Sequence, residues 1–290
     1  MFAPEKLLHM THVAKDQAAR RELERFYLEV FAAQTYFEAR PVEGLDRDET
    51  LILIGELCLI PQCSTDLNSE QGRLRASFAG RFAQMAIKIP DVESTDAHFR
   101  QHGLNPICLH PAYKKIFFMT DPKETLNIRF ELCAVEMPND MRLRPEWSAG
   151  WWRDSHPLGI EKLASIGTAT SDLAQASRFY KEVFGLQQLG QREIPEEGAS
   201  AAAFRIGSKS PFVIEAMQPA AKGTALAEYV SKYGGGIYSV NFKVKSLSKA
   251  ADYLKSKGLR LIGDSKRRVT IDPRDAFGVT FSMVEQDPAA

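Results

Sequence analysis

The chain has 290 residues, 44% of them hydrophobic, and its 37 basic residues balance 37 acidic ones. This length predicts about two domains. Zero net charge gives no electrostatic reason to expect nucleic acid or an anionic membrane as a partner. No apolar run approaches the roughly 18 residues of a membrane span, and the first residues lack a secretory pattern. The four cysteines form no CxxC pair. We therefore expect a cytoplasmic protein with reduced thiols and no membrane contact.

Two heptapeptides of the chain are nearly identical. Residues 25–31 read RFYLEVF and residues 178–184 read RFYKEVF. Such similarity predicts an internal repeat, whose copies can be compared position by position. The same order of elements, a strand, a helix and then further strands, can be traced four times along the chain.

The first two units occupy the N-terminal half. The first is predicted to contain a strand at 7–14, a helix at 18–31 and a closing strand at 51–60. In the second, Asp91 is a plausible N-cap and Gly103 a stop signal for the helix. That unit is predicted to contain a strand at 82–89, a helix at 92–102 and strands at 115–119 and 126–135.

A segment at 137–157, rich in proline, tryptophan and charge, separates the second unit from the third. It contains all three tryptophans, Trp147, Trp151 and Trp152, so we expect it to pack between domains as a linker. The third unit is predicted to have a strand at 163–170, a helix ending before Gly185, and strands at 201–206 and 211–217. The fourth is predicted to have a strand at 237–244, a helix at 247–257, and strands at 269–271 and 279–284.

Repeated strand–helix–strand–strand–strand units with a Phe-Tyr-x-x-Val-Phe-Gly helix end resemble the vicinal oxygen chelate superfamily. This group includes glyoxalase I, methylmalonyl-CoA epimerase, antibiotic resistance proteins and extradiol dioxygenases. The resemblance implies an α+β fold in which four βαβββ modules pair into two glyoxalase-like domains with curved mixed sheets. The domains would span residues 1–136 and 158–290, joined by the 137–157 linker. A monomer and a homodimer are both compatible with such pairing.

The resemblance also implies a divalent metal, Zn, Ni, Mn, Co or Fe, bound by residues of first and last strands. In the family, a histidine lies fourteen residues before the Phe of the Phe-Tyr pair, which indicates His12. Counting back seven residues from the helix cap Asp91 indicates Gln84, and the last strand supplies Glu131. His9 should face the opposite side of the strand from His12.

The same counts in the second half reach weaker ligands. They indicate Ser165, Ser239 and Ser282, with Glu215 as one possible carboxylate. Neutral hydroxyl groups are poor metal ligands, so we expect the second domain to be free of metal. Single histidines and carboxylates often have structural roles, so His12 could be packed, Glu131 ion-paired and Gln84 bonded within the sheet.

The resemblance implies a small-molecule substrate that chelates the metal through two oxygens. We expect a lyase or isomerase of the glyoxalase type, with Glu131 or Glu56 as general base and with His110 and Tyr113 contacting substrate. Two alternatives stay open. One is an extradiol-type ring-cleaving dioxygenase, although Gln84 in place of a histidine weighs against it. The other is a metal-free protein that binds or sequesters a small molecule.

Overall fold

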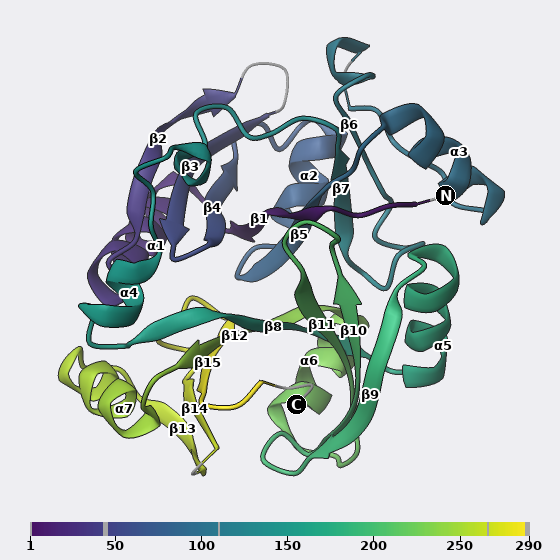
Figure 1. Ribbon diagram of the computed structural model, residues 1–290. Helices are drawn as coiled ribbons and strands as arrows, with labels where there is room; N and C mark the ends of the chain where they lie inside the picture. Colours follow the sequence, from purple (N-terminus) through teal and green to yellow (C-terminus); the bar gives the residue numbers. More distant parts are fainter. Residues whose placement is uncertain (1, 43–45, 110, 266, 288–290) are drawn as a thin grey trace.

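A computed structural model describes residues 2–287 except 43–45, 110 and 266. The described chain forms two mixed β-sheets, one from each half, with helices packed on them (Figure 1). The predicted fold class, an α+β tandem of glyoxalase-like units, is confirmed. Within the described residues, no helix is long and apolar enough to cross a membrane.

The first sheet has seven strands in the described part of the chain, in the order β2-β3-β4-β1-β5-β7-β6. Its central strand β1 pairs in parallel with β4 and antiparallel with β5, so the starts of both N-terminal units lie side by side. The strands are β1 (Lys6–Val13), β2 (Gln34–Val42), β3 (Arg47–Ile54), β4 (Leu57–Ser64), β5 (Arg81–Lys88), β6 (Phe117–Met119) and β7 (Arg129–Cys133).

Two helices of this half, α1 (Gln17–Phe31) and α3 (Val92–Gln101), follow the predicted pattern. Asp16 and Asp91 cap them by accepting bonds from the backbone N–H groups of Ala19 and Ser94, which satisfies donors that a helix start leaves free. A further short helix, α2 (Glu70–Ala76), was not predicted. The last strands of the second unit are shorter than predicted, and an additional bridge joins Ile107 to Met119.

The second sheet has eight strands among the described residues, in the order β13-β14-β15-β12-β8-β11-β10-β9. Its strands are β8 (Ile160–Thr170), β9 (Gln187–Ile194), β10 (Ala199–Ile206), β11 (Phe212–Pro219), β12 (Gly235–Val244), β13 (Leu261–Ser265), β14 (Arg268–Ile271) and β15 (Thr280–Val284). Its helices are α5 (Leu173–Arg178), which continues as a π-helical turn η3 (Phe179–Val183), α6 (Ala225–Tyr233) and α7 (Leu247–Ser256). Helix α6 was not predicted.

One continuous apolar core joins the two halves. Phe31, at the end of α1, contacts Phe242 and Phe281 of the second sheet, with ring centroids 5.9 and 5.1 Å apart. Each fully buried aromatic ring of this kind stabilises the fold by about 1.5–3 kcal/mol. The halves also touch where Gly278 passes Gly80, since a Cβ on Gly278 would lie 2.4 Å from the Gly80 carbonyl oxygen. The two sheets are therefore packed as one body.

The segment between the sheets is packed in part, since Trp152 is buried and Trp147 half-buried while Trp151 is exposed. It contains the short helices η2 (Met141–Leu143) and α4 (Gly150–Asp154), whereas the short helix η1 (Pro111–Tyr113) lies earlier, in the second unit. Trp152 is buried, and its indole N–H donates to the carbonyl oxygen of Phe31 at 2.8 Å.

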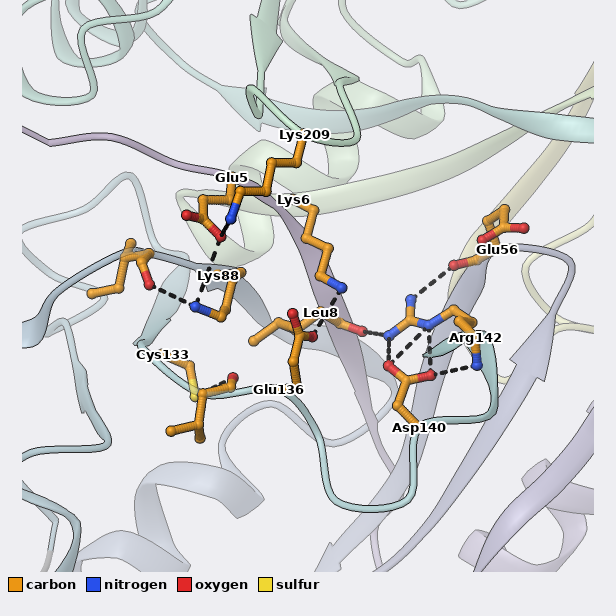
Figure 2. A network of polar contacts seen from close by, with 12 residues as sticks. Glu5, Lys6, Leu8, Glu56, Lys88, Cys133, Glu136, Asp140, Arg142 and Lys209 are labelled. Atoms are coloured by element: carbon orange, nitrogen blue, oxygen red, sulfur yellow. Dashed lines mark hydrogen bonds and ion pairs between the residues drawn. The ribbon is translucent and has the colours of Figure 1, made fainter. Parts of the chain in front are cut away.

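Polar contacts hold this segment and the chain start against their neighbours (Figure 2). Arg142 forms a bidentate pair with Asp140 and donates to the carbonyl oxygens of Leu8 and Glu56. Glu5 lies 2.9 Å from the ammonium group of Lys209, which belongs to the second half, and the Lys209 bond lowers the pKa of Glu5. These contacts fix β1 relative to both halves.

Candidate metal and substrate site

The first sheet has two chemically different faces. Successive side chains of a strand point to opposite faces, so β1 turns Met10 and His12 toward the main core while His9 and Thr11 point away from it. We call the side of the first sheet that points away from the main core the polar face, and we define it by His9, Gln84 and Glu131. It carries the candidate site.

Strand register brings Gln84 and Glu131 onto this face. β5 and β7 run parallel with Gln84 opposite Arg129 and Ala86 opposite Glu131. The Gln84 side-chain N–H donates to Glu131 Oε2 at 2.5 Å, and His9 Nε2 lies 3.8 Å from Glu131 Oε1. All three side chains are buried. Burial alone raises the pKa of Glu131, but His9, Arg47 and Arg129 lower it below its ordinary value, so the carboxylate is ionised at neutral pH.

His12, the histidine expected to bind metal, lies on the other side of the sheet. Its Nδ1 is 2.7 Å from the hydroxyl of Tyr27 on α1, and its Nε2 is 3.3 Å from the Phe277 carbonyl oxygen. Burial is the main reason that its pKa falls to about 3. The expectation for His12 is therefore corrected: the imidazole next to Gln84 and Glu131 belongs to His9. The two histidines do face opposite sides, as predicted.

The count from the Phe-Tyr pair led to His12 and not to His9 because helix α1 is longer than its counterpart in the third unit. Helix α1 has 15 residues, whereas α5 and its π-helical turn have 6 and 5. The Phe of the Phe-Tyr pair therefore lies ten residues after the cap Asp16 but seven after the cap Asp172. Counting back from the cap avoids this extra turn, and seven residues before Asp16 is His9. The signal that identifies His9 was present in the sequence.

The side chains of His9, Gln84 and Glu131 can together accept a divalent cation. In the described part of the chain, no three His, Cys, Asp or Glu side chains converge, so the third donor would be the amide oxygen of Gln84. His9 Nδ1 and Thr11 Oγ1 are buried and have no hydrogen-bond partner among the described atoms. One imidazole, one carboxylate and one amide suit a borderline divalent metal that keeps open positions. The donor set therefore fits such an ion.

The two expected substrate contacts have different outcomes. His110 lies outside the described residues. Tyr113 stacks on Phe117 of β6, with ring centroids 5.2 Å apart. Phe117 is paired with Cys133, two residues after Glu131 on β7, so Tyr113 lies over the polar face. Glu56, considered as an alternative base, is exposed in the β3–β4 turn and does not join the site.

Two arginines near Glu131, Arg47 and Arg129, and a third near Glu49, Arg75, were not anticipated. Arg129 lies two residues before Glu131 on β7, and strand alternation puts both on the polar face. Arg47 begins β3, and Arg75 lies on α2. The alternation that identifies Arg129 was visible in the sequence. Arg75 could not be found because α2 was not predicted.

On the second sheet, an ion pair occupies the equivalent region. Glu215 is fully buried; its Oε1 accepts from Arg192 at 2.8 Å and its Oε2 accepts from the Ser165 hydroxyl at 2.6 Å. Asn241 donates to that hydroxyl in turn and bonds Arg268 through its oxygen. The guanidinium of Arg192 thus neutralises the carboxylate that a metal could otherwise use.

A pocket of about 440 Å³ opens next to this network. Its polar lining includes Arg268, Glu197, Thr270 and Tyr238, and Arg268 pairs with Glu197 at 3.2 Å. Burial is the main cause of a raised pKa at Glu197. The charges within this pair offset each other, and Glu196 adds a second carboxylate to the lining.

Comparison with known proteins agrees with this architecture. Residues 165–277 match the model of the Glyoxalase/Bleomycin resistance protein/Dioxygenase superfamily. The chain therefore carries a domain of this superfamily in its second half, and the family recognised from the repeats is confirmed. A mutant of 4-hydroxymandelate synthase from Streptomyces coelicolor has the same fold throughout, with a TM-score of 0.71 and 13% identity, covering 97% of this chain and 92% of that one.

Similar sequences include two epimerases. Mitochondrial methylmalonyl-CoA epimerase of Mus musculus is 27% identical over 141 residues, which cover 46% of this chain and 78% of the relative. Ethylmalonyl-CoA/methylmalonyl-CoA epimerase of Cereibacter sphaeroides is 24% identical over 111 residues, or 38% of this chain and 81% of the relative. The proteins similar to this chain thus include epimerases, and the superfamily extends to dioxygenases.

Proposed function

We propose that the protein is a metal-dependent lyase or isomerase of the glyoxalase type, acting on a small substrate bound through two oxygens. The observation that carries this proposal is the convergence of His9, Gln84 and Glu131 on the polar face of the first sheet. When bound, a divalent ion would act as a Lewis acid that stabilises negative charge on a substrate oxygen. The epimerases among the similar sequences support chemistry next to a carbonyl group.

The general base in this proposal is Glu49. If Glu131 binds metal, a second carboxylate must accept the proton. Glu49, on β3, is buried; its Oε2 accepts from Gln62 at 2.6 Å and lies 3.0 Å from Arg47. Arg47 also contributes to lowering the pKa of Glu131, so the two carboxylates share a cationic neighbour. In this arrangement Glu49 acts as the base, and Glu131 acts as the metal ligand.

Metal analysis of protein purified without chelators tests the site. We expect about one divalent ion per chain in the parent protein, and loss of it in His9→Ala and Glu131→Gln. His102→Ala, at an exposed helix end, is the matched control and should keep the ion. Equal metal content in all four proteins would overturn the assignment.

A second measurement tests the base. We expect metal-loaded protein to exchange the methyl protons of pyruvate, a probe with vicinal oxygens, for solvent deuterium. Glu49→Gln should keep its metal but exchange about 10²-fold or more slowly. Exchange at the parental rate would remove Glu49 from this role.

For the second half we propose a different function, metal-free binding of a small molecule. The ion pair of Arg192 and Glu215 supports it, since the carboxylate already has a cationic partner. Metal content should therefore be the same in Glu215→Gln as in the parent. A loss of bound metal in this variant would contradict the proposal.

A further inference from the structure

We propose that residues 137–147 form a strap that closes the polar face of the first sheet and opens to admit a ligand, with the Asp140–Arg142 pair as its clasp. The strap follows β7, the last strand of the first sheet along the chain. What passes the strap, a divalent ion and a small molecule, rests on the proposed function. The opening itself is a property of the fold and can be measured without either.

The candidate metal ligands are sealed from solvent. His9 is 3% exposed, and Gln84 and Glu131 are each 6% exposed. A metal that acts on a substrate needs an open coordination position, and the substrate needs a path to it. Some part of the structure must therefore move before the polar face can bind a ligand.

One end of the strap lies over the apolar neighbours of these ligands. Met137 packs on the cluster that contains Ala86 and Cys133. Strand register pairs Ala86 with Glu131, and strand alternation puts Cys133 on the same face as Glu131. Met137 therefore covers the polar face beside the carboxylate.

The middle of the strap covers a second apolar cluster, formed by β3 and β4. Met137, Met141 and Trp147 pack on this cluster. Residues that alternate with its members, such as Ile52 and Leu59, belong to the main core, so the cluster lies on the polar face. Its buried members are Leu51, Leu53, Cys58 and Ile60. The strap thus crosses this face from β7 to β3 and β4.

The strap is not part of the sheet ladder. Among the described residues it contains no strand, and its only regular element is the short helix η2. Its backbone hydrogen bonds join its own members, as from Asp140 to Met137 and from Arg144 to Met141. A segment of this kind can lift by local opening, at a lower free energy than global unfolding.

Arg142 fastens the strap to the sheet. Its guanidinium donates to the carbonyl oxygens of Leu8, next to His9, and of Glu56, in the β3–β4 turn, at 2.8 and 2.9 Å (Figure 2). Asp140 holds the same guanidinium in a bidentate pair, with an N–O distance of 2.7 Å, and its carboxylate is buried. Loss of Arg142 would leave this carboxylate buried without its cation, which destabilises the closed strap.

The closed strap has an unsatisfied donor and free space beside it. The indole N–H of Trp147 is buried and has no hydrogen-bond partner among the described residues, and water would supply one in the open state. One hollow of about 260 Å³ is lined by Arg142 and Leu143, and another of about 250 Å³ by Met141 and Trp147. Both features favour opening.

Two cysteines of the same strand report this opening. On β4, Cys58 lies in the cluster under the strap, whereas Cys63 belongs to the main core on the opposite face. Both are buried. Opening of the strap exposes Cys58 alone, while fraying of β4 or global unfolding exposes both. Labelling of the folded protein with iodoacetamide, located by peptide mass spectrometry, measures the two rates.

We expect Cys58 to be labelled at least about tenfold faster than Cys63 in the parent, and the exposed Cys108 to be labelled fastest. Arg142→Leu should speed the labelling of Cys58 by about tenfold or more and change that of Cys63 less. Arg144→Leu, at an exposed position of the same strap, is the matched control and should be labelled as the parent is.

The direction of this change separates exposure from electrostatics. Burial raises the pKa of the Cys58 thiol to about 11, and the charge of Arg142 opposes this rise. Removing that charge would make the thiol of a closed protein less reactive, because less of it would be thiolate. Faster labelling in Arg142→Leu therefore reports exposure. Equal rates for Cys58 and Cys63 in the parent, or an unchanged Cys58 rate in folded Arg142→Leu, would overturn the proposal.

Uptake of Zn²⁺ by EDTA-treated protein tests what passes the strap. We expect faster uptake in Arg142→Leu than in the parent and in Arg144→Leu. Equal uptake rates in the three proteins would show that the strap does not control access to the site. A parent that takes up no Zn²⁺ would refute the proposed metal site and leave the labelling result intact.

Discussion

Acidification from pH 7 to pH 5 is expected to destabilise the protein by about 2 kcal/mol through His12 alone. In the folded chain, burial keeps the pKa of His12 near 3, compared with an ordinary value of 6.5. The folded state therefore keeps a neutral imidazole at pH 5, while the unfolded chain binds a proton below pH 6.5. The stabilisation is complete above pH 6.5 and is lost progressively as the pH falls toward 3.

The magnitude follows from the pH interval. Each pH unit below 6.5 contributes about 1.4 kcal/mol, so the interval down to pH 5 gives about 2 kcal/mol. His156 adds a similar amount, because burial first and Lys257 second lower its pKa to about 4. Substituting His12 by asparagine should therefore remove about half of the histidine-dependent loss. The variant should also be less stable at pH 7, because Tyr27 loses a buried hydrogen-bond partner.

Urea unfolding at pH 7 and pH 5, followed by tryptophan fluorescence, measures the difference. The change in unfolding free energy between the two pH values should be about 2 kcal/mol smaller in His12→Asn than in the parent. His102→Asn, at an exposed site, should behave as the parent. EDTA should leave the difference unchanged, because His12 is not placed as a metal ligand. A full parental pH dependence in His12→Asn, or a difference abolished by EDTA, would refute the reasoning.

Two further substitutions test the packing between and within the halves. Trp152→Phe should destabilise the protein by about 1–3 kcal/mol in urea unfolding, because the buried carbonyl oxygen of Phe31 loses its donor; an unchanged midpoint would show that this bond is dispensable. Arg192→Leu should destabilise by a similar amount, about 1–3 kcal/mol, since Glu215 would be left buried without its cation while Arg192 itself is partly exposed. Adding Glu215→Gln to Arg192→Leu should restore part of this loss, and simple additivity of the two effects would contradict the pairing.

Much of the fold could be predicted because the repeated units share an order of elements, a heptapeptide at the helix end and a residue type at the helix cap. The paired heptapeptides aligned the first and third units, and helix caps such as Asp91 aligned the second and fourth. Helix α2 and helix α6 lie in the connections between paired units, where no repeated pattern predicts an element. The strands predicted at 115–119 and 126–135 are shorter in the structure, where they span Phe117–Met119 and Arg129–Cys133.

The candidate site was predicted less well, for a specific physical reason. A strand in mid-sheet cannot slip by one residue without turning its side chains to the wrong face, so the distance from strand to helix cap is held constant. The far end of a helix has no such constraint, and α1 is longer by about one turn. The Phe-Tyr pair therefore marks the fold reliably but marks the ligand only where helix length is unchanged. His9 instead of His12 is the consequence.

The two halves also differ in how a buried carboxylate is neutralised. On the second sheet, Glu215 has Arg192 and Ser165 as direct partners, and every charge of that network is matched within the chain. On the first sheet, Glu131 bonds only to the amide of Gln84 among its close partners, with His9 at 3.8 Å. Arg47 and Arg129 act on Glu131 from farther away and, with His9, lower its pKa, so the two carboxylates differ in which groups bond to them directly. A duplicated fold can thus keep its core in both copies while the polar partners of a buried carboxylate differ between them.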